Sequence, residues 1–120
     1  MSCSVDVRQA GNVSIVDLRG RFTVGDSPGI IRDTVSGLIE AGQRNVLLNL
    51  ADVVYMDSAA GIGELIASYH IVMPTGGCVR LLNPGKRVYE VLQLTKLDSV
   101  FEIFTDETQA IRSFEAQRLV

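Results

Sequence analysis

The sequence predicts an α/β protein: one small domain over residues 1–120, with a mixed, mainly parallel β-sheet flanked by helices. Apolar residues follow a two-residue period or form short continuous runs in some segments, and they recur at helical spacing in the segments between. Strands that alternate with helices require right-handed crossovers and therefore pair in parallel. A length of 120 residues suits one domain. The expected order of elements is β-β-α-β-α-β-α-β-α.

Five segments have the pattern of β-strands. The first two alternate apolar with polar side chains around a turn at Gly11, which predicts an antiparallel hairpin with one face half buried. The third is a nearly continuous apolar run, which is typical of a strand that is covered on both sides or central in a sheet. In chain order, the expected strands span residues 5–8, 13–20, 45–50, 78–82 and 99–104.

Four further segments carry apolar residues along one side at helical spacing. Gly42 ends the first of these segments, and Pro74 followed by two glycines ends the second. Each segment starts with residues that favour the beginning of a helix. In chain order, these starts are Ser27 before Pro28, Asp57 with Ser58, Asn83 before Pro84, and Asp106 with Gln109 three residues later.

Charge and composition exclude several classes of protein. The formal net charge is −3 and the 11 Lys and Arg residues are scattered, so we expect neither a nucleic-acid-binding surface nor a lipid-binding patch. The uncharged stretch 65–79 is interrupted by Pro74, so no membrane span is expected, and the N-terminus lacks the pattern of a signal peptide. Cys3 and Cys78 are therefore expected as free thiols of a cytoplasmic protein.

The sequence does not predict an enzyme. His70 is the one histidine, and it follows Ser58 by about 12 residues on the same expected helix, which is about 18 Å and too far for proton transfer. The pair Gly61 and Gly63 begins like a dinucleotide-binding loop, but Ile66 stands where the third glycine is required. We expect no catalytic residues, no metal site and no cofactor.

Ser58 stands where a buried strand leads into a helix, at the carboxyl edge of the expected sheet. Open α/β sheets present their functional groups at this edge. Two interpretations are open at this point: Ser58 or Asp57 caps the helix, or Ser58 accepts a phosphate. The helix N-terminus would favour a phosphate by about 0.3–1 kcal/mol.

Residues 57–63, with the sequence Asp-Ser-Ala-Ala-Gly-Ile-Gly, together with residues 48–53 before them, resemble the signature of STAS-domain anti-sigma factor antagonists. Residues 18–22 are similar to the second strand of that family and its outgoing loop, and residues 83–101 to its late helix–strand unit. The resemblance covers most of the chain. It implies a mixed sheet flanked by helices, in agreement with the periodicity.

The resemblance also implies a function. In this family the unphosphorylated protein binds an anti-sigma factor that is also a serine kinase, which frees the sigma factor. Phosphorylation of a serine at the start of the second helix breaks the complex, and a phosphatase reverses it. Carried over to this chain, Ser58 is the phosphorylation site, and the partner-binding residues are Thr23, Asp26, Asp57, Ser58, Ala59, Ala60 and Gly61. The alternative is a STAS-like interaction module in another signalling assembly, such as a stress-sensing complex or a module that binds a nucleotide or a lipid.

The sequence departs from the family pattern by one residue. The family usually has one residue between the Asp-Ser pair and the Gly-x-Gly pair, whereas this chain has two, Ala59 and Ala60. One extra helical residue rotates what precedes it by about 100°. Either a bulge absorbs the extra residue and Ser58 keeps its place, or Ala59 occupies the acceptor position. In the second case the protein would always be able to bind its partner.

Overall fold

The computed structural model describes residues 3–23, 25 and 29–118. Their elements follow the predicted order, with a π-helical turn at Ser58–Ile62 and short 3-10 turns at Met73–Thr75 and Leu97–Ser99. The strands are β1 Cys3–Ala10, β2 Val13–Phe22, β3 Asn45–Met56, β4 Cys78–Leu82 and β5 Ile103–Phe104. The helices are α1 Ile30–Glu40, α2 Gly63–Val72, α3 Lys86–Leu94 and α4 Glu107–Arg118.

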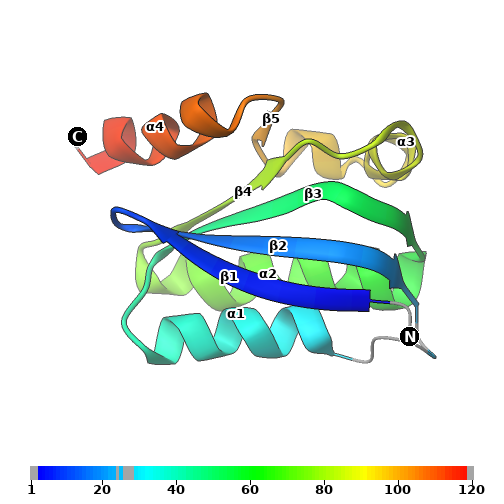
Figure 1. The fold of residues 1–120 in the computed structure, drawn as a ribbon, viewed down its shortest axis with the longest axis horizontal. Coiled ribbons are helices and arrows are strands. Elements are labelled where there is room, and N and C mark those ends of the chain that lie inside the picture. Colours follow the sequence, from blue (N-terminus) through cyan, green and yellow to red (C-terminus); the bar gives the residue numbers. More distant parts are fainter. Residues whose placement is uncertain (1–2, 24, 26–28, 119–120) are drawn as a thin grey trace.

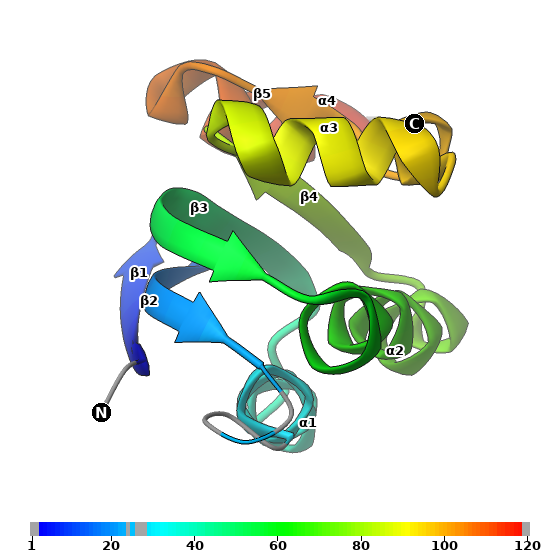
Figure 2. The same cartoon turned by 90° about the vertical axis from the view of Figure 1, so that its right-hand side faces the viewer.

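The five strands lie side by side in chain order. β1 and β2 form the predicted antiparallel hairpin, and the pairs β2–β3, β3–β4 and β4–β5 are parallel. Helices α1 and α2 cover one face of this sheet, while α3 and α4 lie on the other side (Figures 1 and 2). The predicted fold class, a mixed and mainly parallel sheet flanked by helices, is confirmed.

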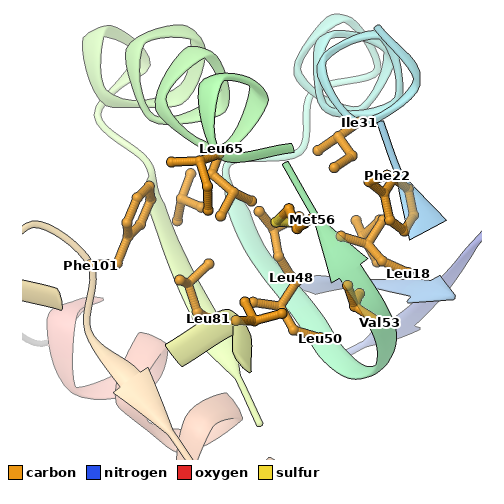
Figure 3. Close-up of a cluster of buried hydrophobic side chains, with 14 of the residues drawn as sticks. Leu18, Phe22, Ile31, Leu48, Leu50, Val53, Met56, Leu65, Leu81 and Phe101 are labelled. Carbon is orange, nitrogen blue, oxygen red and sulfur yellow. The ribbon is translucent and has the colours of Figure 1, made fainter. Parts of the chain in front are cut away.

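The core is divided by the alternation of side chains along β3. Leu48 and its alternate neighbours on β3 form one cluster with side chains of α1, α2 and α3, and Met56 points into the same cluster (Figure 3). Leu47 faces the other way and packs with Phe114 of α4. This strand therefore has apolar side chains on both faces, which explains the continuous apolar run in the sequence.

Strand β3 is longer than predicted: it continues to Met56, although the expected strand ends at residue 50. Its pairing with β2 shifts register between Asp17 and Arg19 and again between Gly20 and Arg21. Such bulges bend a strand and break its two-residue period, so the second half of β3 does not have the sequence pattern of a strand. The bent end of β3 carries the chain to the segment that begins at Asp57.

The last strand is shorter than predicted. The expected strand 99–104 is wrong at its start, because Leu97–Ser99 form a 3-10 turn and β5 consists of Ile103–Phe104. The N–H groups of Val100 and Phe101 both donate to the carbonyl of Leu97, which closes this turn.

One helix start differs from prediction and another agrees. Asn83 does not cap α3, because its N–H donates to the carbonyl of Phe104 and continues the β4–β5 pairing, and its φ is 52°. The helix begins only at Lys86. At α4 the Oδ2 of Asp106 accepts the N–H of Gln109 at 2.9 Å, as predicted.

The first helix begins at Ile30. The predicted capping pair, Ser27 and Pro28, lies outside the described residues. Gly29 precedes the helix with φ 75°, a conformation that favours glycine.

Cys3 and Cys78 are not joined in a disulfide. Cys3 pairs with Gly20 near the carboxyl end of β2, whereas Cys78 pairs with Asn45 at the amino end of β3. They therefore lie toward opposite edges of the sheet.

Candidate functional site

The carboxyl ends of β2 and β3 meet at one edge of the sheet. Phe22 and Met56 are the last paired residues of these strands, and the N–H of Asp57 donates to the carbonyl of Phe22 at 3.1 Å. Thr23 and Asp57 follow directly, so two of the predicted site residues leave the sheet side by side. Thr23 is partly buried.

The chain enters α2 through a wide turn. The carbonyl of Asp57 accepts the N–H of Ile62 at 2.9 Å, which is the five-residue spacing of a π-helix, and also the N–H of Gly61 at 3.2 Å. Oδ1 of Asp57 accepts the same Gly61 N–H at 3.1 Å. Of the two residues expected to cap this helix, Asp57 therefore makes a capping hydrogen bond. A π-turn holds one residue more than an α-turn, and such turns are frequent at functional sites.

Both ends of this turn are fixed by the core. Asp57 is bonded to β2 through Phe22, and Gly61 lies directly on Met56: a Cβ on Gly61 would stand 1.9 Å from Cγ of Met56. The extra residue relative to the family pattern is therefore accommodated between them, in residues 58–60. The turn Ser58–Ile62 is wide enough to absorb the extra residue, and the choice between Ser58 and Ala59 at the acceptor position stays a prediction.

Ser58 is exposed at the mouth of the turn. Ala59, Ala60 and Gly61 complete the predicted segment along the same turn, and Gly61 is buried. Asp26, which the sequence also assigns to the partner-binding surface, lies outside the described residues. The structure thus brings Thr23, Asp57 and Ser58 together at the carboxyl edge.

Glu64 is a residue of this region that the sequence analysis missed. It lies in the first turn of α2 and is 6% exposed, yet its carboxylate reaches the start of α1. Oε2 accepts the N–H of Gly29 at 2.9 Å, and Oε1 accepts those of Ile31 at 2.8 Å and Arg32 at 3.0 Å. One signal was present in the sequence: between Asp57 and Arg80, Glu64 is the sole formally charged residue, and a carboxylate in an apolar helix needs partners.

His70 lies on the exposed side of α2, with its ring edge against Tyr69 at a centroid distance of 5.7 Å. Within residues 3–23, 25 and 29–118, His, Cys, Asp and Glu side chains do not gather in groups of three or more that could hold a metal. No helix in this part of the chain combines the length and the apolar character that crossing a bilayer requires.

Comparison with known proteins agrees with this geometry. The sequence pattern of the STAS domain matches residues 4–110. The chain belongs to the STAS domain family of anti-sigma factor antagonists. The anti-sigma-B factor antagonist of Bacillus subtilis is 31% identical over 86% of this chain and 92% of its own length. The anti-sigma F factor antagonist of Paenibacillus polymyxa is 23% identical over 96% of this chain and 97% of its own length.

Solved structures of STAS proteins share the fold. An anti-sigma factor antagonist from Mycobacterium paratuberculosis superposes with a TM-score of 0.83, covering 95% of each chain at 19% identity. Unphosphorylated SpoIIAA gives 0.79 over 94% of this chain and 97% of its own, at 18% identity. The phosphorylated form of the Bacillus protein SpoIIAA gives 0.71 over 92% and 98%, at 21% identity. Members of this family are regulatory proteins and not enzymes, as the sequence predicts.

Proposed function

We propose that the unphosphorylated protein binds an anti-sigma factor with serine kinase activity, and that this binding releases the sigma factor. Phosphorylation of Ser58 ends the interaction, and a phosphatase restores it. The protein acts in the cytoplasm. The observation that carries the proposal is the exposed Ser58 at the mouth of the π-turn, on the carboxyl edge of the sheet, in a chain of the anti-sigma factor antagonist family.

The position of Ser58 supports a role as phosphate acceptor. Ser58 is exposed, whereas Asp57 before it and Gly61 after it are fixed to the core through Phe22 and Met56. A kinase can therefore reach the hydroxyl without unfolding the domain. In the sequence, Ser58 is followed by two residues of small size, Ala59 and Ala60.

The electrostatics of the turn support a switch that acts on the partner. A phosphate adds about 1.5 to 2 negative charges. The N–H groups of Gly61 and Ile62 already donate to Asp57, so the phosphate does not gain these two donors, and it adds its charge beside the Asp57 carboxylate. The added charge is therefore directed at whatever binds this surface, and a partner that tolerates one carboxylate there would meet two anionic groups.

The partner-binding surface in this proposal consists of Thr23, Asp26, Asp57, Ser58, Ala59, Ala60 and Gly61. Thr23 and Asp57 support it by their position, since hydrogen bonding between Asp57 and Phe22 brings both to the same edge. The relatives named as antagonists of anti-sigma factors give the class of partner.

Charge substitutions test the proposal by calorimetric titration with the anti-sigma factor of the same cell. Ser58→Asp is expected to weaken binding by roughly tenfold or more, and Ser58→Ala to retain the affinity of the wild type. The matched control is Thr108→Asp, which adds the same charge at an exposed position of α4, on the opposite side of the sheet. Equal affinities of Ser58→Asp and Thr108→Asp would contradict the proposal.

A further inference from the structure

The start of α1 is held by a side chain of another helix. Three backbone N–H groups, those of Gly29, Ile31 and Arg32, donate to the carboxylate of Glu64 on α2 at 2.8–3.0 Å. An ordinary helix cap comes from the residue just before the helix. At Gly29 no side chain makes such a cap. The backbone N–H groups at the start of α1 are therefore bound by a residue far away in the sequence, and these hydrogen bonds connect α1 with α2.

A buried carboxylate is suited to this role. Glu64 is 6% exposed, and its charge is balanced by three N–H donors at the positive end of a helix. Any movement of α1 along α2 would break these charge-assisted bonds together and leave a buried charge without partners, which is unfavourable. The two helices begin at the same edge of the molecule and run side by side (Figures 1 and 2).

Glu64 also lies just after the turn Ser58–Ile62, which carries the proposed phosphorylation site. It follows Gly61 by three residues, and Gly61 is bonded to Asp57 at the start of the π-turn. The first turn of α1 presents Arg32 and Asp33 to solvent, with 52% and 75% of their side chains exposed. A single side chain thus joins the turn that carries Ser58 to an exposed, charged helix start beside it.

We propose that Glu64 is a positioning residue for partner binding: it holds the first turn of α1 in a fixed place relative to the Ser58 turn, so that both contact the partner together. This inference rests on the proposed function. In a folded variant without the Glu64 carboxylate, the first turn of α1 is no longer fixed, and the partner must order it on binding, which costs affinity.

The test compares Glu64→Gln with Val72→Ala. Glutamine has the same shape but no charge, and its NH₂ group cannot accept a hydrogen bond. Val72 is fully buried at the far end of the same helix, so its truncation lowers stability without touching the start of α1. For each variant we would measure urea unfolding, amide hydrogen exchange by NMR, and affinity for the anti-sigma factor.

In Glu64→Gln we expect exchange at the Gly29, Ile31 and Arg32 amides to be faster by roughly tenfold, beyond any change at amides of the central strands. We expect affinity to fall by roughly tenfold, whereas Val72→Ala, at equal or lower stability, binds like the wild type. If Glu64→Gln does not fold, Glu64→Asp replaces it, since it keeps the charge but shortens the reach, and it should show both effects to a smaller degree.

Three results would overturn the inference: unchanged exchange at the three amides, faster exchange with wild-type affinity, or the same loss of affinity in Val72→Ala. A wild-type protein that binds no anti-sigma factor would refute the proposed function instead. The exchange measurement is independent of the partner, so it distinguishes the two failures.

Discussion

At the scale of single residues, the shape of the site depends on a glycine. Gly61 lies so close to Met56 that an added Cβ would stand 1.9 Å from Cγ, 3.0 Å from Cβ and 3.2 Å from Cα of that methionine. Rotation of the Met56 side chain relieves the first contact, but the other two involve atoms that rotation does not move. Met56 in turn is part of the core under α1 and α2 (Figure 3). The end of β3 and the π-turn can therefore approach this closely only with glycine at position 61.

Gly61→Ala is accordingly expected to lower the free energy of unfolding by about 1–3 kcal/mol, because the backbone must shift to make room. Urea unfolding measures this. The control is Gly37→Ala in α1, where an added Cβ meets nothing within 4 Å. Alanine at this helical position should stabilise the protein by about 0.5–1 kcal/mol. A Gly61→Ala variant as stable as Gly37→Ala would contradict this account.

At the scale of elements, the sequence predicts what is periodic and local. The hairpin and the strand at Cys78–Leu82 agree with the structure because their patterns are regular and their ends carry turn residues. The second half of β3 was missed because its bulges break the two-residue period. The cap at Asn83 was wrong because asparagine favours helix caps but is also among the residues most often found in the left-handed conformation, which it adopts here.

The candidate site likewise contains one part that the sequence predicts and one part that it does not. The segment that starts at Asp57 was predictable, since a short motif carries it and the carboxyl edge of a parallel sheet follows from the topology. The contact between Glu64 and Gly29 was not, because it joins residues far apart in sequence, and only the packing of α1 on α2 brings them together. A lone charge in an apolar helix indicates a partner but does not identify it.

The π-turn makes a prediction about the extra alanine. Deletion of Ala60 should allow an ordinary α-turn between Asp57 and Gly61, since both ends are already fixed to the core. We expect the deletion variant to fold and to be phosphorylated on Ser58, like the wild type, when incubated with the cognate kinase and ATP. Mass spectrometry of the phosphopeptides identifies the site.

Deletion of Ala67 is the control, because in the middle of α2 the loss of one residue rotates the buried side chains that precede or follow it by about 100° and should unfold the protein. Phosphate on Ser58 in the Ala60 deletion but not in the wild type would show that the natural sequence has lost its switch. Phosphate on neither would remove Ser58 as the acceptor.

At the scale of the whole molecule, a polar cluster joins the hairpin to the rest of the sheet and to α4. Arg8 of β1 donates to both carboxylate oxygens of Asp17 on β2 at 2.6 and 3.0 Å, and also to Glu107 of α4. Asn49 of β3 donates to the same Asp17 at 2.8 Å. Asp17 is buried. Hydrogen bonds to its carboxylate and to its partner Arg8 thus connect β1, β2, β3 and α4.

The hydrogen bond from Arg8 holds the pKa of Asp17 below its usual range, with a further contribution from Asn49, and burial opposes the shift. Because the folded protein binds this proton less tightly than the unfolded chain does, the ionised carboxylate stabilises the fold above its ordinary pKa of about 4. That contribution is lost as the pH falls below this value.

Asp17→Asn should therefore be less stable than the wild type at about pH 7, and the difference in free energy of unfolding between the two should narrow towards about pH 3. Urea unfolding across this range tests it, with Asp98→Asn, exposed on the turn Leu97–Ser99, as the control that should follow the wild type. A stability difference between Asp17→Asn and wild type that does not change with pH would mean that this carboxylate acts through its shape and not through its charge.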